Sequence, residues 1–304
     1  MLFFGAGAFG TLYAAKLCGA GHDVSVLARG ARLAAIRRDG LRVRDRATGR
    51  EQRAHPTLVT TVANRAKYDL VIVLVRSAQV DEALRQIATD HTGDVLVMVN
   101  EARGYDPWRG LLGARLMVGF GGAMAAFDDC GVLQYKLAPR AIQPTVIGEP
   151  DGRTTDRVLR VAGALRGAGF PVQVRQDMEA WQRTHAAWIV PFMLVSAAAA
   201  RKPQSRIDAQ RVRTWVRATR ESLLAVRASG TALTPLPFRA LLVLPGALTA
   251  SALRVALRSA SFRAQIAASG ALSTQEGLAL AADLQALSAQ PLPHLAALAA
   301  AVTD

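Results

Sequence analysis

Gly5, Gly7 and Gly10 form the pattern Gly-x-Gly-x-x-Gly close to the N-terminus of the chain. An apolar run precedes this pattern, and a segment with apolar residues at helical spacing, 11–18, follows it. In such a turn the first glycine permits a tight bend, the second lets a pyrophosphate approach the backbone, and the third lets the helix pack on the strand. The N-terminus of the helix also favours a phosphate charge. We therefore predict a binding turn for a nicotinamide or flavin dinucleotide, formed by Gly5, Ala6, Gly7, Ala8, Phe9 and Gly10; the alternative is a glycine-rich turn without a ligand.

The end of the next β-rich run, 22–28, favours one dinucleotide over the other. A carboxylate at this point would bind the ribose hydroxyls of NAD, whereas an arginine accommodates the 2′-phosphate of NADP. Arg29 follows the run directly, Arg32 lies one helical turn further, and no carboxylate is present there. We therefore predict NADP(H) as the cofactor with Arg29 on its 2′-phosphate, the alternative being that Arg29 is a surface charge.

The first half of the chain alternates short β-rich runs with helical periodicity, which is typical of a parallel sheet covered by helices. The predicted parallel strands lie in 3–4, 22–28, 69–75, 94–99 and 116–120, and the predicted helices between them in 9–18, 31–38 and 80–88. The segment 41–60 alternates polar and apolar residues, which indicates an antiparallel excursion at the sheet edge. Late strands are expected in 132–135, 144–147 and 171–174, with a helix over 156–166.

From about residue 177 the β-rich runs disappear, and the chain becomes rich in alanine, leucine and arginine. The sequence therefore predicts two domains: an α/β Rossmann-type domain with a parallel sheet over 1–176, and an all-helical domain for substrate binding and dimerisation over 177–304. The ligand site is expected at the carboxyl ends of the strands, facing the helical domain.

Composition excludes several other classes of protein. With 51% hydrophobic and 20% charged residues among 304, the chain is not disordered. The net charge of +14 comes from arginines scattered along the chain, so we expect no nucleic-acid partner; the scatter fits an arginine-rich background or a pocket for an anionic ligand. Two cysteines are too few for a disulfide framework, no signal peptide is visible, and the apolar runs 184–200 and 284–303 contain prolines. A cytoplasmic protein without membrane spans or a metal site is therefore expected.

Several short motifs make the chain resemble the ketopantoate reductase (2-dehydropantoate 2-reductase) family. They are Gly5 to Gly10, Leu27-Ala28-Arg29, Asp39-Gly40-Leu41, Leu74-Val75-Arg76 with Gln79, Val99-Asn100 and Val146-Ile147-Gly148. The resemblance covers the N-terminal domain well and the helical domain only in outline. It implies reduction of a 2-keto acid by NADPH, in pantothenate biosynthesis, with the substrate between the two domains.

The same resemblance implies the site residues. Asn100 stands where the family has an asparagine that contacts the cofactor and the reacting centre. Arg76 stands where the family usually has a lysine, and the resemblance implies that it binds the cofactor and the substrate. Arg183 matches the catalytic lysine, and Glu276 is the nearest match to the family's substrate glutamate. Arginine can bind a carboxylate or an oxyanion, but it is a poor acid because it stays protonated.

Other positions depart from the family pattern or add to it. Glu101 follows the asparagine where a glycine is normal, and Ala187 and Pro191 replace two substrate-binding asparagines. His185 could bind substrate or donate a proton if it reached the cleft, although its spacing from Arg183 directs it to another face of a helix. Two functions follow: an NADPH-dependent reductase of a 2-keto acid, as a possible homodimer, or a catalytically silent NADP-binding sensor or scaffold.

Overall fold

The computed structural model describes residues 1–62, 68–89, 93–201 and 207–303. The chain forms two compact units, the first comprising 1–99 and 105–178, and the second comprising 100–104 and 179–304. The sequence predicts a boundary after residue 176, whereas the structure changes unit after Met178 and adds the segment 100–104 to the helical unit.

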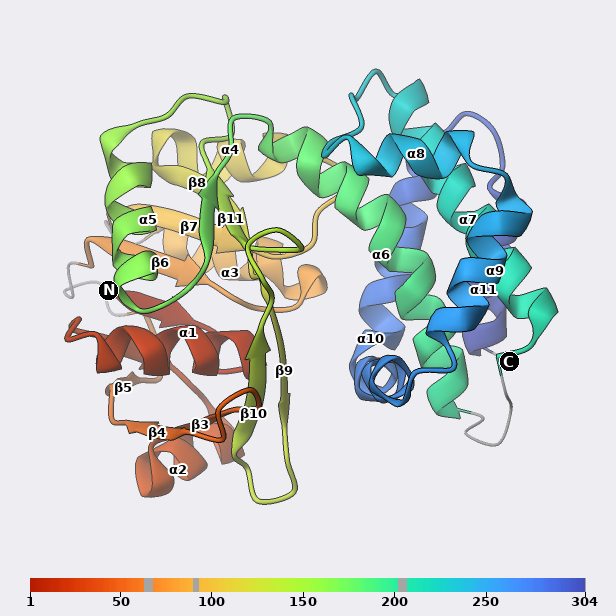
Figure 1. The fold of residues 1–304 in the computed structure, drawn as a ribbon. Coiled ribbons are helices and arrows are strands. Elements are labelled where there is room, and N and C mark those ends of the chain that lie inside the picture. Colours follow the sequence, from red (N-terminus) through yellow and green to blue (C-terminus); the bar gives the residue numbers. More distant parts are fainter. Residues whose placement is uncertain (63–67, 90–92, 202–206, 304) are drawn as a thin grey trace. The chain divides into compact units, whose positions relative to one another are not determined.

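The main sheet of the first unit has eight strands in the order β12-β11-β8-β7-β6-β1-β2-β5 (Figure 1). They are β1 (Leu2–Phe4), β2 (Ser25–Leu27), β5 (Thr57–Val59), β6 (Leu70–Val73), β7 (Asp94–Met98), β8 (Leu116–Phe120), β11 (Thr145–Gly148) and β12 (Val172–Val174). The neighbouring strands β5, β2, β1, β6, β7 and β8 are parallel to one another, as predicted. Strand β11, by contrast, runs antiparallel to β8. An antiparallel neighbour needs no crossover helix, and no helix lies between β8 and β11.

A second sheet of four strands in the order β4-β3-β10-β9 corrects one prediction. Its strands are β3 (Leu41–Asp45), β4 (Glu51–Ala54), β9 (Ala123–Phe127) and β10 (Leu133–Leu137). The segment predicted as an excursion of the main sheet edge forms the β3-β4 hairpin here, because β3 pairs with β10 instead. Within that segment, β5 alone joins the main sheet.

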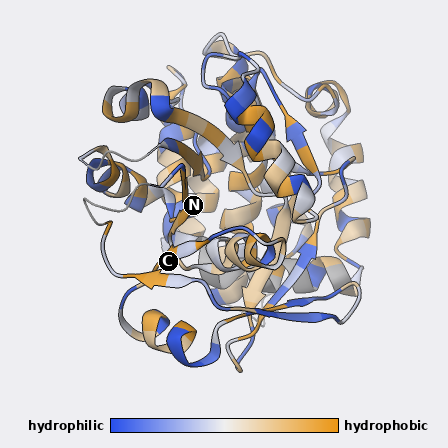
Figure 2. Cartoon of the chain, turned by 90° about the vertical axis from the view of Figure 1, so that its left-hand side faces the viewer, coloured by the Kyte–Doolittle hydropathy of each residue, from blue (hydrophilic) through white to orange (hydrophobic). Residues whose placement is uncertain are grey.

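Helices cover both sheets of the first unit. They are α1 (Ala8–Gly19), α2 (Gly30–Asp39), α3 (Val80–Ala88), α4 (Asp106–Leu112) and α5 (Asp156–Gly167), with short 3-10 turns η1 (Ser77–Gln79) and η2 (Gly113–Arg115). Figure 2 shows helices that carry both hydrophobic and hydrophilic residues, as is typical of helices with one face on a sheet. Helix α1 contacts strands of both sheets and is buried along most of its length, with Tyr13 stacked on Phe170 and hydrogen-bonded to Thr145.

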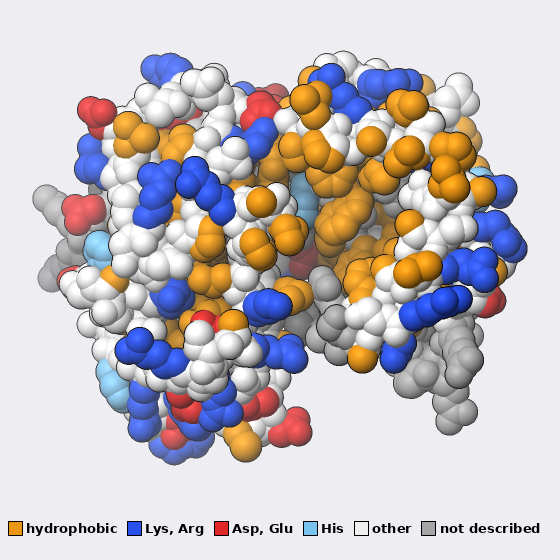
Figure 3. Space-filling model, viewed as in Figure 1, with side chains coloured by type: hydrophobic (Ala, Val, Ile, Leu, Met, Phe, Trp, Pro, Cys, Tyr) orange, Lys and Arg blue, Asp and Glu red, His pale blue; other side chains and the backbone are white. Residues whose placement is uncertain are grey.

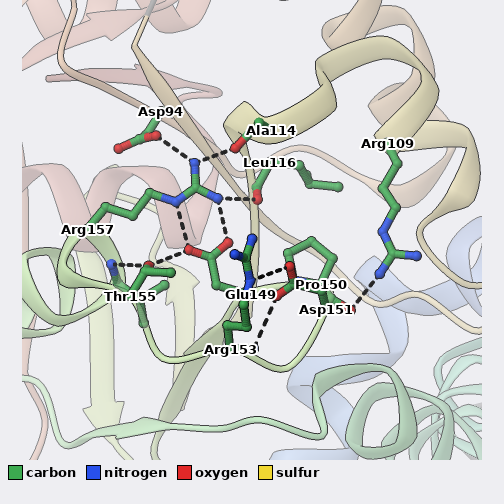
Figure 4. Close-up of polar contacts among 11 residues, drawn as sticks. Asp94, Arg109, Ala114, Leu116, Glu149, Pro150, Asp151, Arg153, Thr155 and Arg157 are labelled. Atoms are coloured by element: carbon green, nitrogen blue, oxygen red, sulfur yellow. Dashed lines mark hydrogen bonds and ion pairs between the residues drawn. The ribbon is translucent and has the colours of Figure 1, made fainter.

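A partly buried ion-pair network ties α5 to the main sheet (Figure 4). Arg157 donates to Glu149 from Nε at 2.7 Å and from Nη2 at 2.5 Å, and to Asp94 from Nη1 at 2.8 Å. It also donates to the backbone carbonyls of Ala114 and Leu116. Because the Glu149 side chain is only 2% exposed, its charge depends on Arg157 for compensation.

The second unit is helical, with α6 (Met178–Arg201), α7 (Ala209–Ala228), α8 (Pro237–Val243), α9 (Gly246–Ala256), α10 (Ala260–Ala286) and α11 (Pro293–Thr303). Its core contains apolar residues of α6, α7, α10 and α11. Figure 3 shows hydrophobic side chains gathered on this unit. The exposed large apolar residues on and beside α8 and α9 are Leu236, Val243, Leu244, Leu248 and Val255. Among the described residues, we find no helix whose length and apolar content would let it cross a membrane.

Candidate functional site

The glycine-rich turn has the geometry that its spacing predicts. Gly5 has φ of +119°, and a Cβ there would lie 2.4 Å from the carbonyl oxygen of Leu74. A Cβ on Gly10 would lie 1.9 Å from the carbonyl oxygen of Gly5, so the first and third glycines permit close backbone packing. At Gly7, by contrast, nothing lies within 4 Å of the Cβ position. The turn is therefore tight at both ends and open at the middle glycine.

The open glycine is the N-cap of α1, and this end of the helix is suited to an anion. No side chain caps it, and its first turn contains no acidic residue. The first backbone N–H groups of a helix have no partner within the helix and carry partial positive charge. The turn and these N–H groups together fit the pyrophosphate of a dinucleotide.

Two arginines lie at the corner between β2 and α2. Arg29 is exposed and donates to the carbonyl of Thr60 at 3.2 Å and to Gln86 at 3.4 Å. Arg32 is partly buried and reaches the glycine-rich turn, where it donates to the carbonyl of Ala6 at 3.0 Å and to Oγ1 of Thr11 at 2.8 Å. Neither forms an ion pair with a carboxylate among the residues that the structure describes.

Arg32 has no carboxylate partner among the residues that the structure describes. Its guanidinium lies 4.4 Å from the ring centroid of Phe127, and burial lowers its pKa from the usual value. The sequence predicts Arg29 at the 2′-phosphate, with Arg32 one helical turn further, whereas the contact of Arg32 with the glycine-rich turn joins residues 26 apart in sequence. This corner would therefore gain from a bound phosphate.

Arg76 follows β6, the strand next to β1, so it lies at the same sheet edge as the glycine-rich turn. The backbone supports this placement, because the N–H of Leu74 donates to the carbonyl of Phe4 at 3.0 Å. The backbone N–H of Arg76 donates to Oε1 of Gln79 at 3.3 Å, while its side chain is exposed. The guanidinium is thus accessible at this edge.

Asn100 and Glu276, which the family resemblance links to the reaction, are brought together in the helical unit. Nδ2 of Asn100 donates to Oε1 of Glu276 at 2.9 Å, across 176 residues of sequence. The other amide atom, Oδ1 of Asn100, is buried and accepts no hydrogen bond from the residues described. A buried acceptor without a donor is costly, so this atom is suited to receive a hydroxyl or amine from a ligand.

Glu101, beside this pair, is 4% exposed, and its burial raises its pKa. It accepts hydrogen bonds from the backbone N–H of Arg103 at 2.6 Å and from the Arg103 guanidinium at 3.2 and 3.3 Å. The carboxylate that replaces the family's glycine is therefore engaged within its own loop.

Arg183 contacts the same loop. Its Nε donates to the carbonyl of Ala102 at 3.1 Å, and its Nη2 donates to the carbonyl of Arg103 at 2.9 Å. Its Nη1 donates to Oγ1 of Thr231 at 2.8 Å, and Glu179 forms an ion pair with it at 2.7 Å. The predicted substrate-binding arginine is thus already bound to four acceptors of the protein.

His185 is 5% exposed, and its ring is stacked on Trp181 at a centroid distance of 5.0 Å. Burial lowers its pKa to about 4. The imidazole is therefore neutral at pH 7 and a poor proton donor there. Ala187 and Pro191, where the family resemblance leads us to expect asparagines, are also buried, so this part of α6 offers no polar side chain at those positions.

The buried imidazole predicts a pH-dependent stability. Because the folded pKa of about 4 is below the unfolded value of about 6.5, the unfolded chain binds the proton more readily, and stability is lost as the pH falls between these values. By pH 4.5 the loss from His185 is on the order of 2 kcal/mol. His185→Phe keeps an aromatic ring on Trp181 but does not titrate. Urea unfolding at pH 7 and pH 4.5 should show a smaller loss in the variant; equal losses in both proteins would contradict this assignment.

An α/β unit with a glycine-rich turn after its first strand, followed by a helical unit, defines a dinucleotide-binding fold of Rossmann type. Residues 1–149 match the family model of ketopantoate reductase PanE/ApbA. Residues 1–149 therefore have the sequence pattern of the ketopantoate reductase family.

Curated relatives support this assignment. The 2-dehydropantoate 2-reductase of Mesorhizobium japonicum is 31% identical over 211 residues, which cover 59% of this chain and 61% of that protein. The protein of the same name from Pyrococcus horikoshii is 31% identical over 180 residues, covering 59% of this chain and 56% of that protein. The match thus spans about three fifths of the length of these relatives.

Solved structures share the fold over the whole chain. The 2-dehydropantoate 2-reductase of Methylococcus capsulatus has a TM-score of 0.69 at 17% identity, covering 99% of this chain and 95% of that one. D-Mandelate dehydrogenase, solved with NADH and anilino(oxo)acetate, has a TM-score of 0.72 at 14% identity, covering 100% and 97%. At these identities the likeness establishes the fold alone.

Proposed function

We propose that this protein is an NADPH-dependent oxidoreductase that reduces the carbonyl group of a 2-keto acid to a hydroxyl group. The observation that carries the proposal is the hydrogen bond between Asn100 and Glu276, with Oδ1 of Asn100 left as a buried acceptor. The family pattern of residues 1–149 and the names of the curated relatives support the same reaction.

The residues of the first unit fit the cofactor. The glycine-rich turn and the first N–H groups of α1 would bind the pyrophosphate, and Arg29 the 2′-phosphate, with Arg32 adding positive charge beside it. When bound, NADPH would supply the hydride to the carbonyl carbon, and the proton that completes the hydroxyl group would come from water. Arg76 and Asn100 are also proposed to contact the cofactor, as the family resemblance implies.

The substrate would be held by charge and by hydrogen bonds. The Arg76 guanidinium is proposed to attract the carboxylate of the keto acid. The second N–H of Asn100 Nδ2 is proposed to donate to the carbonyl oxygen of the keto acid, while Oδ1 of Asn100 and the Glu276 carboxylate accept from a hydroxyl group of the ligand. A role of His185 in substrate binding stays a prediction, and so do a homodimer, a cytoplasmic location and a place in pantothenate biosynthesis.

Removing the charge of Arg29 should change cofactor choice. Arg29→Ala should weaken NADPH binding roughly tenfold to a hundredfold, the size of a lost charged hydrogen bond, and leave NADH binding nearly unchanged. Fluorescence titrations with both nucleotides measure this, and the control is Arg37→Ala, which removes an exposed arginine from the last turn of α2. Parallel losses for NADPH and NADH would mean that Arg29 does not recognise the 2′-phosphate.

The reductase itself is tested by NADPH consumption with a panel of 2-keto acids that includes ketopantoate. Turnover that depends on both the keto acid and Asn100 would support the proposal. The second candidate is a catalytically silent NADP-binding sensor or scaffold, which the arginine at position 183 and the apolar side chains of Ala187 and Pro191 favour. Tight NADPH binding without turnover on any member of the panel would support that candidate.

A further inference from the structure

We propose that Arg183 is a positioning residue that fixes the backbone of residues 100–104, and through it Asn100, and that it neither donates a proton nor binds the substrate. This inference rests on the proposed reductase function, because it assigns a role within that site. The contacts that carry it lie within the helical unit and the loop 100–104, which belongs to that unit.

All three nitrogen atoms of the Arg183 guanidinium donate hydrogen bonds to other groups of the protein. It has five N–H donors in a planar fork. Two of them bind successive loop carbonyls, those of Ala102 and Arg103, and a third binds Thr231, which precedes α8. Glu179, one helical turn earlier on α6, pairs with Nη2 at 2.7 Å, and the Arg183 side chain is only 16% exposed.

The charge of Arg183 is also already compensated. A substrate carboxylate would have to replace Glu179 or compete with it, and it would gain little from a cation that has its own counter-ion. Because a guanidinium does not lose its proton in proteins, Arg183 cannot replace the lysine as an acid. The geometry therefore leaves it a structural role in the site.

We call the hydrogen bonds from Arg183 to the loop carbonyls and to Thr231 the clamp, and the conformation of the loop backbone allows them. Gly104 has φ of +109°, and a Cβ there would lie 3.0 Å from Nη2 of Arg183 and 3.0 Å from Oε1 of Glu179. A side chain at position 104 would thus disturb both the backbone and the ion pair. At the other end of the loop, Asn100 is held by Glu276 of α10. The five-residue loop is therefore tied to α6 at one end and to α10 at the other.

A lysine at position 183 could not make the same set of contacts. An ammonium group offers its three donors from a single point, whereas these acceptors surround a planar fork and are met by three different nitrogen atoms. Arg183→Lys should therefore loosen the loop even though it restores the residue type that the family uses for catalysis.

The first test is independent of any activity. Trypsin cleaves after arginine, and the bond between Arg103 and Gly104 lies inside the clamped loop while the Arg103 side chain is exposed. Limited proteolysis of the full chain, followed by mass spectrometry of the fragment that starts at Gly104, should show cleavage roughly tenfold faster in Arg183→Ala and Arg183→Lys. Thr231→Val, which removes one contact, should show a smaller increase. Arg160→Ala, at an exposed position of α5, is the matched control and should cleave like the wild type.

A second measurement separates positioning from substrate binding. If Arg183 positions the loop, Thr231→Val should lower kcat/KM severalfold, and the double variant with Arg183→Ala should be no worse than Arg183→Ala alone, because both remove one clamp. Wild-type kinetics in Thr231→Val, together with a raised KM in Arg183→Ala, would overturn the inference in favour of substrate binding. Higher turnover in Arg183→Lys would overturn it in favour of proton donation.

The proteolysis tests the positioning role of Arg183 even if no 2-keto acid is reduced. Faster cleavage without turnover would support the clamp and reject the reductase function. Unchanged cleavage in Arg183→Ala and in Thr231→Val would reject the clamp whatever the activity. Should Arg183→Ala fail to fold, Thr231→Val alone supplies the comparison.

Discussion

Asn100→Ala is expected to lower kcat/KM for reduction of a 2-keto acid by about a hundredfold to a thousandfold, the effect of removing one preorganised hydrogen-bonding group from a reacting centre. Nδ2 of Asn100 is fixed by Glu276 at 2.9 Å, and its buried Oδ1 has no donor among the described residues. Glu276 therefore fixes the amide through one N–H, and the second N–H of Nδ2 is the group that we expect to donate to the carbonyl oxygen of the keto acid. Most of the loss should appear in kcat, because the group acts on the reacting oxygen.

Steady-state kinetics at saturating NADPH measure this effect, with Gln290→Ala as a control that truncates an exposed amide elsewhere. Glu276→Gln should cause a smaller loss than Asn100→Ala, because a glutamine can still accept the hydrogen bond from Asn100. Unchanged kcat in Asn100→Ala, with NADPH binding intact, would remove Asn100 from the reacting centre.

The second large effect concerns stability. Arg157→Met should destabilise the protein by about 3–5 kcal/mol, because it leaves Glu149 buried without its cation. The variant also loses the bonds from Arg157 to Asp94 and to two backbone carbonyls (Figure 4). Urea unfolding followed by circular dichroism gives the change in the free energy of unfolding.

The matched control is Arg153→Met, which breaks the ion pair between Arg153 and Asp151. The side chains of these two residues are 75% and 47% exposed, respectively. Exposed pairs contribute at most about 1 kcal/mol, so this variant should unfold almost like the wild type. The double variant Arg157→Met with Glu149→Leu should recover much of the lost stability, because it removes the uncompensated charge. Equal destabilisation by Arg153→Met and Arg157→Met would contradict this account of the network.

Much of the main sheet could be predicted from the sequence, because each buried parallel strand is a short apolar run between helices with clear periodicity. The runs at 69–75 and 94–99 contain β6 and β7, and the glycine spacing locates the turn after β1. Hydrophobic periodicity does not predict which strands pair with each other. The antiparallel β11 and the separate sheet of β3 and β10 depend on pairing between distant segments, and strand β9 is too rich in alanine to give a β-rich pattern.

In the candidate site, too, the contacts that join residues far apart in the sequence could not be predicted from local patterns. Asn100 and Glu276 were identified through resemblance to a family, and no spacing in the sequence indicates that they meet. The roles of Arg32 and Arg183 depend on acceptors that local patterns do not reveal, at Ala6 for Arg32 and at Ala102 for Arg183. The family resemblance implies that Arg183 stands in place of a lysine, and the structure shows what this arginine binds.

The most direct test of the proposed reaction follows the hydride itself. The protein is incubated with NADPH deuterated at C4 of the nicotinamide and with each 2-keto acid of the panel, and the products are analysed by mass spectrometry. The account predicts a 2-hydroxy acid that carries deuterium on the carbon that was the carbonyl, and no such product from Asn100→Ala above a small residual level. NADPH binding without deuterium in any product would contradict the reductase function and leave a protein that binds the nucleotide without using it.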